Sequence, residues 1–148
     1  MDYMREALKE AKRSLKTGDV PIGAVAVVEG KIIARAHNEK EKRSDATAHA
    51  ELLCLQKAAK KLGTWRLYEV DIYSTLEPCA MCAGAMVLAR IKKLVFGAND
   101  PKAGAAGSVV NILNDKRFNH RIRTVPGVMS KECNALLTSF FKKLRGRI

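Results

Sequence analysis

Runs rich in β-branched residues alternate with helix-like stretches through the first two thirds of the chain, and this alternation constrains the fold most. The expected elements are a helix at 2–17, two strands within 22–38 joined by a turn at Glu29 and Gly30, a helix at 48–62, a strand at 70–75, a helix at 80–90 and a strand at 92–98. Because such alternation packs helices against a largely parallel or mixed sheet, we predict a three-layer α/β/α fold with about five strands and helices on both faces.

The last third of the chain is expected to complete the same domain. A glycine- and alanine-rich loop at 100–108 is followed by a predicted short helix, a strand at 121–125 and a C-terminal helix beginning near Ser130. We predict a single domain over 1–148, because the length suits one core and no linker or repeat divides it. No apolar run reaches the roughly 20 residues that span a bilayer, and no secretory signal pattern opens the chain. We therefore expect a cytoplasmic protein that does not associate with membranes.

Positive charge is concentrated near the C-terminus. The formal net charge is +12, and residues 116–148 hold nine Lys or Arg against one acid, Glu132. This pattern indicates a polyanionic partner, and nucleic acid is favoured over a membrane because no surface helix with bulky apolar anchors accompanies the charge. The alternative is a basic face that only promotes solubility.

Two short motifs carry residues that are suited to metal chemistry. TAHAE contains His49 and Glu51, and EPCAMC contains Cys79 and Cys82. Each motif opens one of the expected helices, and ligands in open α/β sheets gather where strands end and helices begin. The two motifs are therefore expected to form one site.

One histidine and two cysteines that leave a fourth position for water are typical of catalytic zinc. Cys79 and Cys82 share one face of a first helical turn, where the helix dipole favours the thiolates that bind metal. We predict one Zn²⁺ held by these two cysteines and His49. Because zinc lowers the pKa of its bound water toward ~7, the carboxylate of Glu51 is expected to transfer that proton and not to bind the metal.

The CxxC spacing alone also fits a redox pair or half of a structural metal site. A redox pair gives no role to His49 and Glu51, and a structural site lacks a convincing fourth ligand. Cys54 and Cys133 lie among leucines and alanines and are expected to be small core residues. HxE and PCxxC together match the signature of zinc-dependent base deaminases.

These motifs, with VPIGAV, ARAHN, FGANDPKAGAAGS, FNHR and FFKKLR, make the chain resemble the bacterial tRNA-specific adenosine deaminases over essentially its whole length. TAHAE and TLEPCAMCAGAM are shared with many cytidine-deaminase-like enzymes, whereas the other stretches point to the tRNA branch. The resemblance implies a cytidine-deaminase-like fold and hydrolysis of the wobble adenosine (position 34) of an arginine tRNA to inosine. It also implies one zinc per subunit and a homodimer whose partner helps to line the RNA groove.

The resemblance implies roles for individual residues besides the zinc ligands and Glu51. Those expected at the nucleoside are Asn38, Ala50, Pro78 and Ile22, and those expected on the anticodon loop are Asp100, Lys102, Asn119, His120, Phe140, Phe141 and Arg145. Ile22 and Ala103 stand where the family also has a smaller aliphatic or a hydroxyl residue, which bears on fine substrate preference. Asn38 could equally be a turn residue, and at least one of the two phenylalanines is expected to pack against the core.

Two other functions compete with tRNA deamination. A deaminase of a free base or nucleoside, such as cytosine, cytidine or guanine, would use the same metal chemistry, but a small neutral substrate needs no basic segment. A zinc-stabilised RNA-binding module without activity would explain the basic segment, but it needs no acid/base residue at Glu51.

Overall fold

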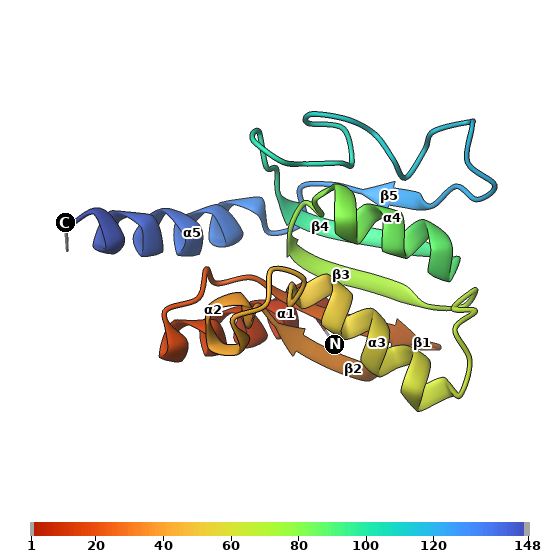
Figure 1. Cartoon of the computed structure of the whole chain (residues 1–148), viewed down its shortest axis with the longest axis horizontal. Coiled ribbons are helices and arrows are strands. Elements are labelled where there is room, and N and C mark those ends of the chain that lie inside the picture. The colour runs from red at the N-terminus through yellow and green to blue at the C-terminus, as the bar shows by residue number, and fades with distance from the viewer. Residues whose placement is uncertain (1, 147–148) are drawn as a thin grey trace.

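The computed structural model describes residues 2–146, which contain one five-stranded sheet (Figure 1). The strands are β1 (Gly23–Val28), β2 (Lys31–His37), β3 (Asp71–Leu76), β4 (Lys93–Ala98) and β5 (Arg123–Val125). They are ordered β2-β1-β3-β4-β5, with β1 antiparallel to both of its neighbours and β3, β4 and β5 mutually parallel. The sheet is therefore mixed, as predicted, and β2, β3, β4 and β5 all end at the edge where β1 begins.

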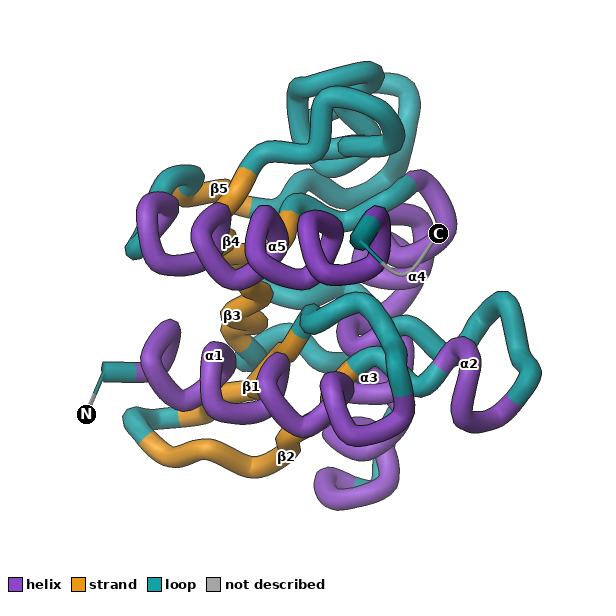
Figure 2. Tube along the Cα trace, turned by 90° about the vertical axis from the view of Figure 1, so that its left-hand side faces the viewer, coloured by secondary structure: helices purple, strands orange, loops and turns teal. Residues whose placement is uncertain are grey.

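Helices cover both faces of this sheet (Figure 2). The α-helices within residues 2–146 are α1 (Tyr3–Arg13), α2 (Lys40–Arg43), α3 (Ala50–Leu62), α4 (Ala80–Ala89) and α5 (Ser130–Arg145). Met4 of α1 and Cys133 of α5 are buried with Val25 and Val95 on one face. The helices α3 and α4 pack on the other face, so the predicted three-layer α/β/α arrangement is confirmed.

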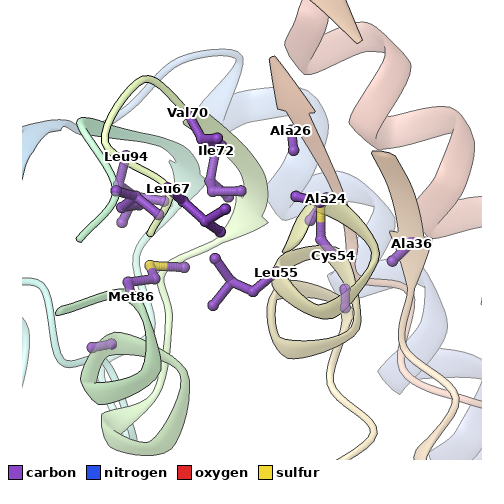
Figure 3. Packing of buried hydrophobic residues seen from close by; sticks show 14 of the residues in the cluster. Ala24, Ala26, Ala36, Cys54, Leu55, Leu67, Val70, Ile72, Met86 and Leu94 are labelled. Atoms are coloured by element: carbon purple, nitrogen blue, oxygen red, sulfur yellow. The ribbon is translucent and has the colours of Figure 1, made fainter. Parts of the chain in front are cut away.

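The larger core lies between the sheet and the helix pair α3 and α4 (Figure 3). Leu55 of α3 and Met86 of α4 are buried there with Ile72 of β3 and Leu94 of β4. Burying a side chain of this size contributes about 1.5–3 kcal/mol, so the contacts fix both helices against the strands. The positions of the two helix N-termini are thereby fixed as well.

Two glycines are required by the geometry of the first strands. Glu29 and Gly30 have φ values of 49° and 75°, which is the pattern of a type I′ turn and confirms the predicted hairpin. A Cβ atom on Gly23 would lie 2.1 Å from the carbonyl oxygen of Ala7. Glycine at 23 therefore allows the backbone of α1 to approach the start of β1.

The structure differs from the predicted elements in three places. The helix expected at 2–17 is α1 followed by a 3₁₀ turn over Ser14–Thr17, which ends at Gly18. The prediction of a short helix before β5 is wrong. The backbone there forms turns, in which the N–H groups of Arg117 and Phe118 donate hydrogen bonds to Asp115. The four-residue helix α2 was not expected. None of the helices within 2–146 is long and apolar enough to cross a membrane.

Candidate active site

The strand ends on one edge of the sheet surround a cavity of about 490 Å³. Ile22 precedes β1, Asn38 follows β2, Leu76 ends β3 and Asn99 follows β4. The remaining lining residues are Val20, Lys40, His49, Asp100, Pro101, Lys102, Leu137 and Phe141. A cavity at the carboxyl ends of the strands is the usual place for a ligand in an open α/β sheet.

The three predicted zinc ligands meet beside this cavity. His49 and Cys79 are the N-cap residues of α3 and α4, and Cys82 lies in the first turn of α4. His49 Nδ1 is 3.6 Å from the Sγ atoms of both Cys79 and Cys82, and the three donor atoms lie within 4.8 Å of one another. A tetrahedral zinc with bonds of about 2.3 Å to sulfur and 2.0–2.1 Å to nitrogen separates such donors by about 3.5 Å, so the residues fit this ion.

The electrostatics of the cluster favour a cation. The hydrogen bond from Cys82 lowers the pKa of Cys79 to about 3, and the same contact raises the pKa of Cys82. The hydrogen bond with Cys79 also raises the pKa of His49, against the opposing effect of burial. The lowered pKa of Cys79 favours its thiolate, the form that binds a divalent cation.

Glu51 follows the ligand His49 by two residues and is nearly fully buried, with 3% of its surface exposed. Burial raises the pKa of its carboxyl to about 7, and the charge of Cys79 acts in the same direction. Among the described residues, the cluster that could hold a metal contains His49, Cys79 and Cys82 without Glu51. A carboxyl that titrates near neutrality beside the cluster is suited to transfer protons.

Several residues expected at the substrate line the cavity, namely Ile22, Asn38, Asp100, Lys102 and Phe141. Asn38 is also a turn residue: its side-chain amide donates to Val20 O at 3.2 Å, and its oxygen accepts from Lys40 N–H at 3.2 Å. Asn38 is therefore a turn residue that also lines the cavity, and its contact with a nucleoside stays a prediction. Ala50 is fully buried as the first residue of α3, and the Pro78 carbonyl accepts a 2.8 Å hydrogen bond from Ala105 N–H.

The helix α5 begins beside β4 and runs beyond the edge of the sheet (Figure 1). Phe141 lines the cavity, while Phe140 and Arg145 line adjacent hollows of about 380 and 320 Å³. The two rings pack edge to face with their centroids 5.3 Å apart. Phe141 is 40% exposed and Phe140 is half-buried, so neither ring packs into the core.

Asn119 and His120 lie elsewhere. His120 Nε2 is 2.7 Å from the carbonyl oxygen of Ile91, just before β4 begins, whereas the cavity is at the opposite end of β4. Neither residue lines the cavity of its own chain. Their contact with RNA stays a prediction.

The sequence motifs did not reveal the role of Glu77, which precedes Pro78 and Cys79. Its buried carboxylate accepts hydrogen bonds from the loop at 100–108. Burial raises the pKa of this carboxyl, but the hydrogen bonds from Ser108 and from backbone N–H groups lower it below its usual range. Its signal in the sequence is an acid at the end of a buried strand. Lys40 was also missed, because it stands in a charged run.

The fold and the site together resemble known deaminases. Residues 1–145 match the MafB19-like deaminase family. The tRNA-specific adenosine deaminase of Bacillus subtilis is 54% identical over 97% of this chain and 89% of its own length, and that of Aquifex aeolicus is 47% identical over 99% and 96%.

Solved structures agree with these relatives. A structure from a study of A-to-I editing by tRNA:A34 deaminases at the wobble position of transfer RNA superposes with a TM-score of 0.88 at 41% identity, covering 91% of this chain and 98% of that one. A guanine deaminase from Nitrosomonas europaea shares the fold with a TM-score of 0.81, at 23% identity over 93% of this chain and 82% of that one.

The mixed five-stranded sheet and the His-Cys-Cys cluster define a deaminase with the cytidine-deaminase-like fold. Within that class, the chain belongs to the tRNA-specific adenosine deaminase family. This confirms the family, the fold class and the type of enzyme that the sequence motifs predicted.

The ligand cluster predicts how metal content responds to substitution. His49→Ala, Cys79→Ala and Cys82→Ala should each lose most of the zinc, because two remaining donors cannot complete the site. Glu51→Gln should retain about one zinc per chain and lose at least about 100-fold in activity, the usual contribution of a positioned proton-transfer group. Metal analysis of the purified variants measures the first effect and a deamination assay the second.

Cys54→Ala is the matched control, because Cys54 is a buried free cysteine outside the cluster. It should keep its zinc. Loss of zinc from Glu51→Gln would make Glu51 a ligand, and near-normal activity of that variant would remove its role in proton transfer.

Proposed function

We propose that this chain hydrolyses the wobble adenosine, position 34, of a tRNA anticodon to inosine with one zinc ion per subunit, and that its substrate is an arginine tRNA. The observation that carries the proposal is the convergence of His49, Cys79 and Cys82 beside a cavity that Lys40 and Lys102 border. A tRNA substrate places the enzyme in the cytoplasm.

The residues of the site divide the chemistry between them. When bound, zinc would supply the Lewis acidity that makes water a nucleophile near neutral pH. Glu51 takes a proton from the attacking water and delivers it to the substrate as the bond from C6 to the amino group breaks. Ammonia leaves, and the oxygen of the water remains on C6. The raised pKa of Glu51, about 7, suits a group that must both accept and release that proton.

The cavity walls provide what recognition of an RNA loop requires. A base must leave its stack to reach the cluster, and a cavity of about 490 Å³ is large enough for a nucleoside. Phe141 offers a partly exposed ring on which a neighbouring base can stack. Lys102 and Arg145 line the hollow beside it and can contact phosphates.

Deamination of a free base or nucleoside remains the second candidate, favoured by the fold that the chain shares with a guanine deaminase. The cations around the cavity argue against it. A neutral base gains nothing from Lys40, Lys102 and Arg145, whereas the phosphates of an RNA loop do.

The substrate is tested by presenting alternatives in parallel. The purified chain should convert adenosine 34 to inosine in an anticodon stem-loop of an arginine tRNA, and it should leave free adenosine, cytidine and guanine essentially unchanged. Chromatography of the digested products measures the conversion. A faster reaction with any free base or nucleoside than with the stem-loop would contradict the proposal, and binding of RNA without any conversion would indicate a module without activity.

The exposed end of α5 predicts how RNA binding responds to substitution. Phe141→Ala should weaken stem-loop binding by about 1–3 kcal/mol, the usual value of one stacked base, at every salt concentration. Arg145→Ala should matter most at low salt and should flatten the salt dependence by about one phosphate contact. A salt titration of stem-loop binding measures both effects.

Lys131→Ala on the same helix is the control for charge, because Lys131 is exposed and lines none of the hollows at the cavity. Its salt dependence should equal that of the wild type. Unchanged binding of Phe141→Ala and Arg145→Ala, with thermal melts that show folded protein, would mean that the end of α5 is only a solvated face.

We propose that the chain forms a homodimer through the exposed sides of α3 and α4. An apolar hollow of about 280 Å³ lies between these helices, with Leu88 72% exposed and Trp65 55% exposed at its rim. Leu88→Glu should therefore yield monomers in analytical ultracentrifugation, because a charge buried within an apolar interface opposes association. Val109→Glu, at an apolar residue of 55% exposure away from this hollow, should stay dimeric. A monomeric wild type would contradict the proposal.

A further inference from the structure

Glu77 is a buried acid with no part in the chemistry described above. It lies between the end of β3 and the ligand Cys79, and only 1% of its surface is exposed. Its own N–H donates to the carbonyl of Ala98 at 2.8 Å, which ties the end of β3 to the end of β4. The sheet therefore fixes the backbone of Glu77, so the position from which its side chain extends is fixed as well.

The hydrogen bonds to the carboxylate of Glu77 come from one loop, at 100–108. Its Oε1 accepts from Asp100 N–H at 2.9 Å and from the Ser108 hydroxyl at 2.5 Å. Its Oε2 accepts from Ala106 N–H at 2.9 Å and from Ser108 N–H at 3.1 Å. Burying a carboxylate is costly unless hydrogen bonds replace its water, so these donors and the charge hold each other in place.

The glycine-rich sequence of the loop fits around this carboxylate. A Cβ atom on Gly104 would lie 2.3 Å from Cδ of Glu77, so position 104 must be glycine for the backbone to pass the acid. Gly107 has a φ of +130°, which a residue with a side chain rarely adopts. The stretch GAAGS therefore forms a cradle whose shape depends on Glu77.

The same loop is joined to the metal-ligand turn on one side and to the cavity on the other. Cys79 and Gly104 form an isolated β-bridge, and Ala105 N–H donates to the Pro78 carbonyl. Asp100 and Lys102, at the start of the loop, line the cavity. Displacing the loop would therefore move one wall of the cavity relative to the cluster.

We propose that Glu77 is a positioning residue that fixes the loop at 99–108, and with it the wall formed by Asp100 and Lys102, at the distance from the zinc ligands that an RNA loop requires. The link to RNA rests on the proposed function. The role is separate from catalysis, because Glu77 faces the loop and not the cavity lining.

Glu77→Gln tests the proposal with almost no change of volume. Replacing either oxygen by NH₂ sets a donor against at least one backbone N–H group. Losing one hydrogen bond to a charged group corresponds to roughly tenfold or more in local opening, so hydrogen exchange in a peptide over 99–110 should accelerate by about that factor. KM for the anticodon stem-loop should rise about tenfold, with kcat changed much less, and zinc content should stay at the wild-type value.

Gly104→Ala perturbs the same loop while residue 77 remains a glutamate. Its added Cβ would displace the carboxylate, so it should reproduce the faster exchange and the raised KM even if Glu77→Gln fails to fold. Asp19→Asn is the matched control. Asp19 is an equally buried acid whose carboxylate accepts from Glu41 N–H and Lys42 N–H on the opposite wall, so this variant should leave exchange in 99–110 unchanged.

Unchanged exchange in 99–110 in both loop variants would overturn the positioning role. Faster exchange with an unchanged KM would overturn the link between this wall and RNA. Equal falls in kcat and zinc content with an unchanged KM would also overturn the proposal, because they would show that Glu77 only supports the metal site. If the wild type fails to act on the stem-loop, the proposed function fails, while the exchange measurement still decides whether Glu77 positions the loop.

Discussion

The rest of the site depends on bringing the N-termini of two helices together at one edge of the sheet. His49 caps α3 and Cys79 caps α4, and their donor atoms must meet to within 4.8 Å with that of Cys82. No local interaction joins the two helix starts, which are 30 residues apart in sequence. The buried contacts of Leu55 and Met86 with the strands set both helices, so the precision of the cluster comes from the packed core.

Two buried carboxylates then fix the walls on either side of the cluster. Glu77 accepts the N–H groups of the loop that carries Lys102, and Asp19 accepts two N–H groups of α2, which carries Lys40. Both acids are satisfied mainly by backbone donors, so each orders a segment that buries few apolar side chains of its own. This arrangement lets exposed, polar segments hold defined positions beside the cavity.

The sequence predicted the parts of this architecture that local patterns determine. Alternating strands and helices gave the three layers, and the spacing of His49, Cys79 and Cys82 gave the cluster. The loop at 100–108 was predicted, but its path and helix α2 could not be, because their backbone hydrogen bonds go to distant acceptors such as Glu77 and Asp19. A short periodic pattern cannot reveal such partners.

The structure also changes what the net charge of +12 implies. The basic residues of the C-terminal segment lie in two regions of the structure. Arg145 is beside the cavity, whereas Arg123 of β5 lies opposite Lys93 in the sheet, at the far end of β4. The two ends of this six-residue strand are about 17 Å apart, which is about two Debye lengths at physiological ionic strength. Charges near Arg123 are therefore largely screened from a ligand in the cavity of their own chain, whereas Lys40, Lys102 and Arg145 line the cavity or the hollow beside it. Net charge thus indicates the class of partner, while the fold decides which cations can touch it.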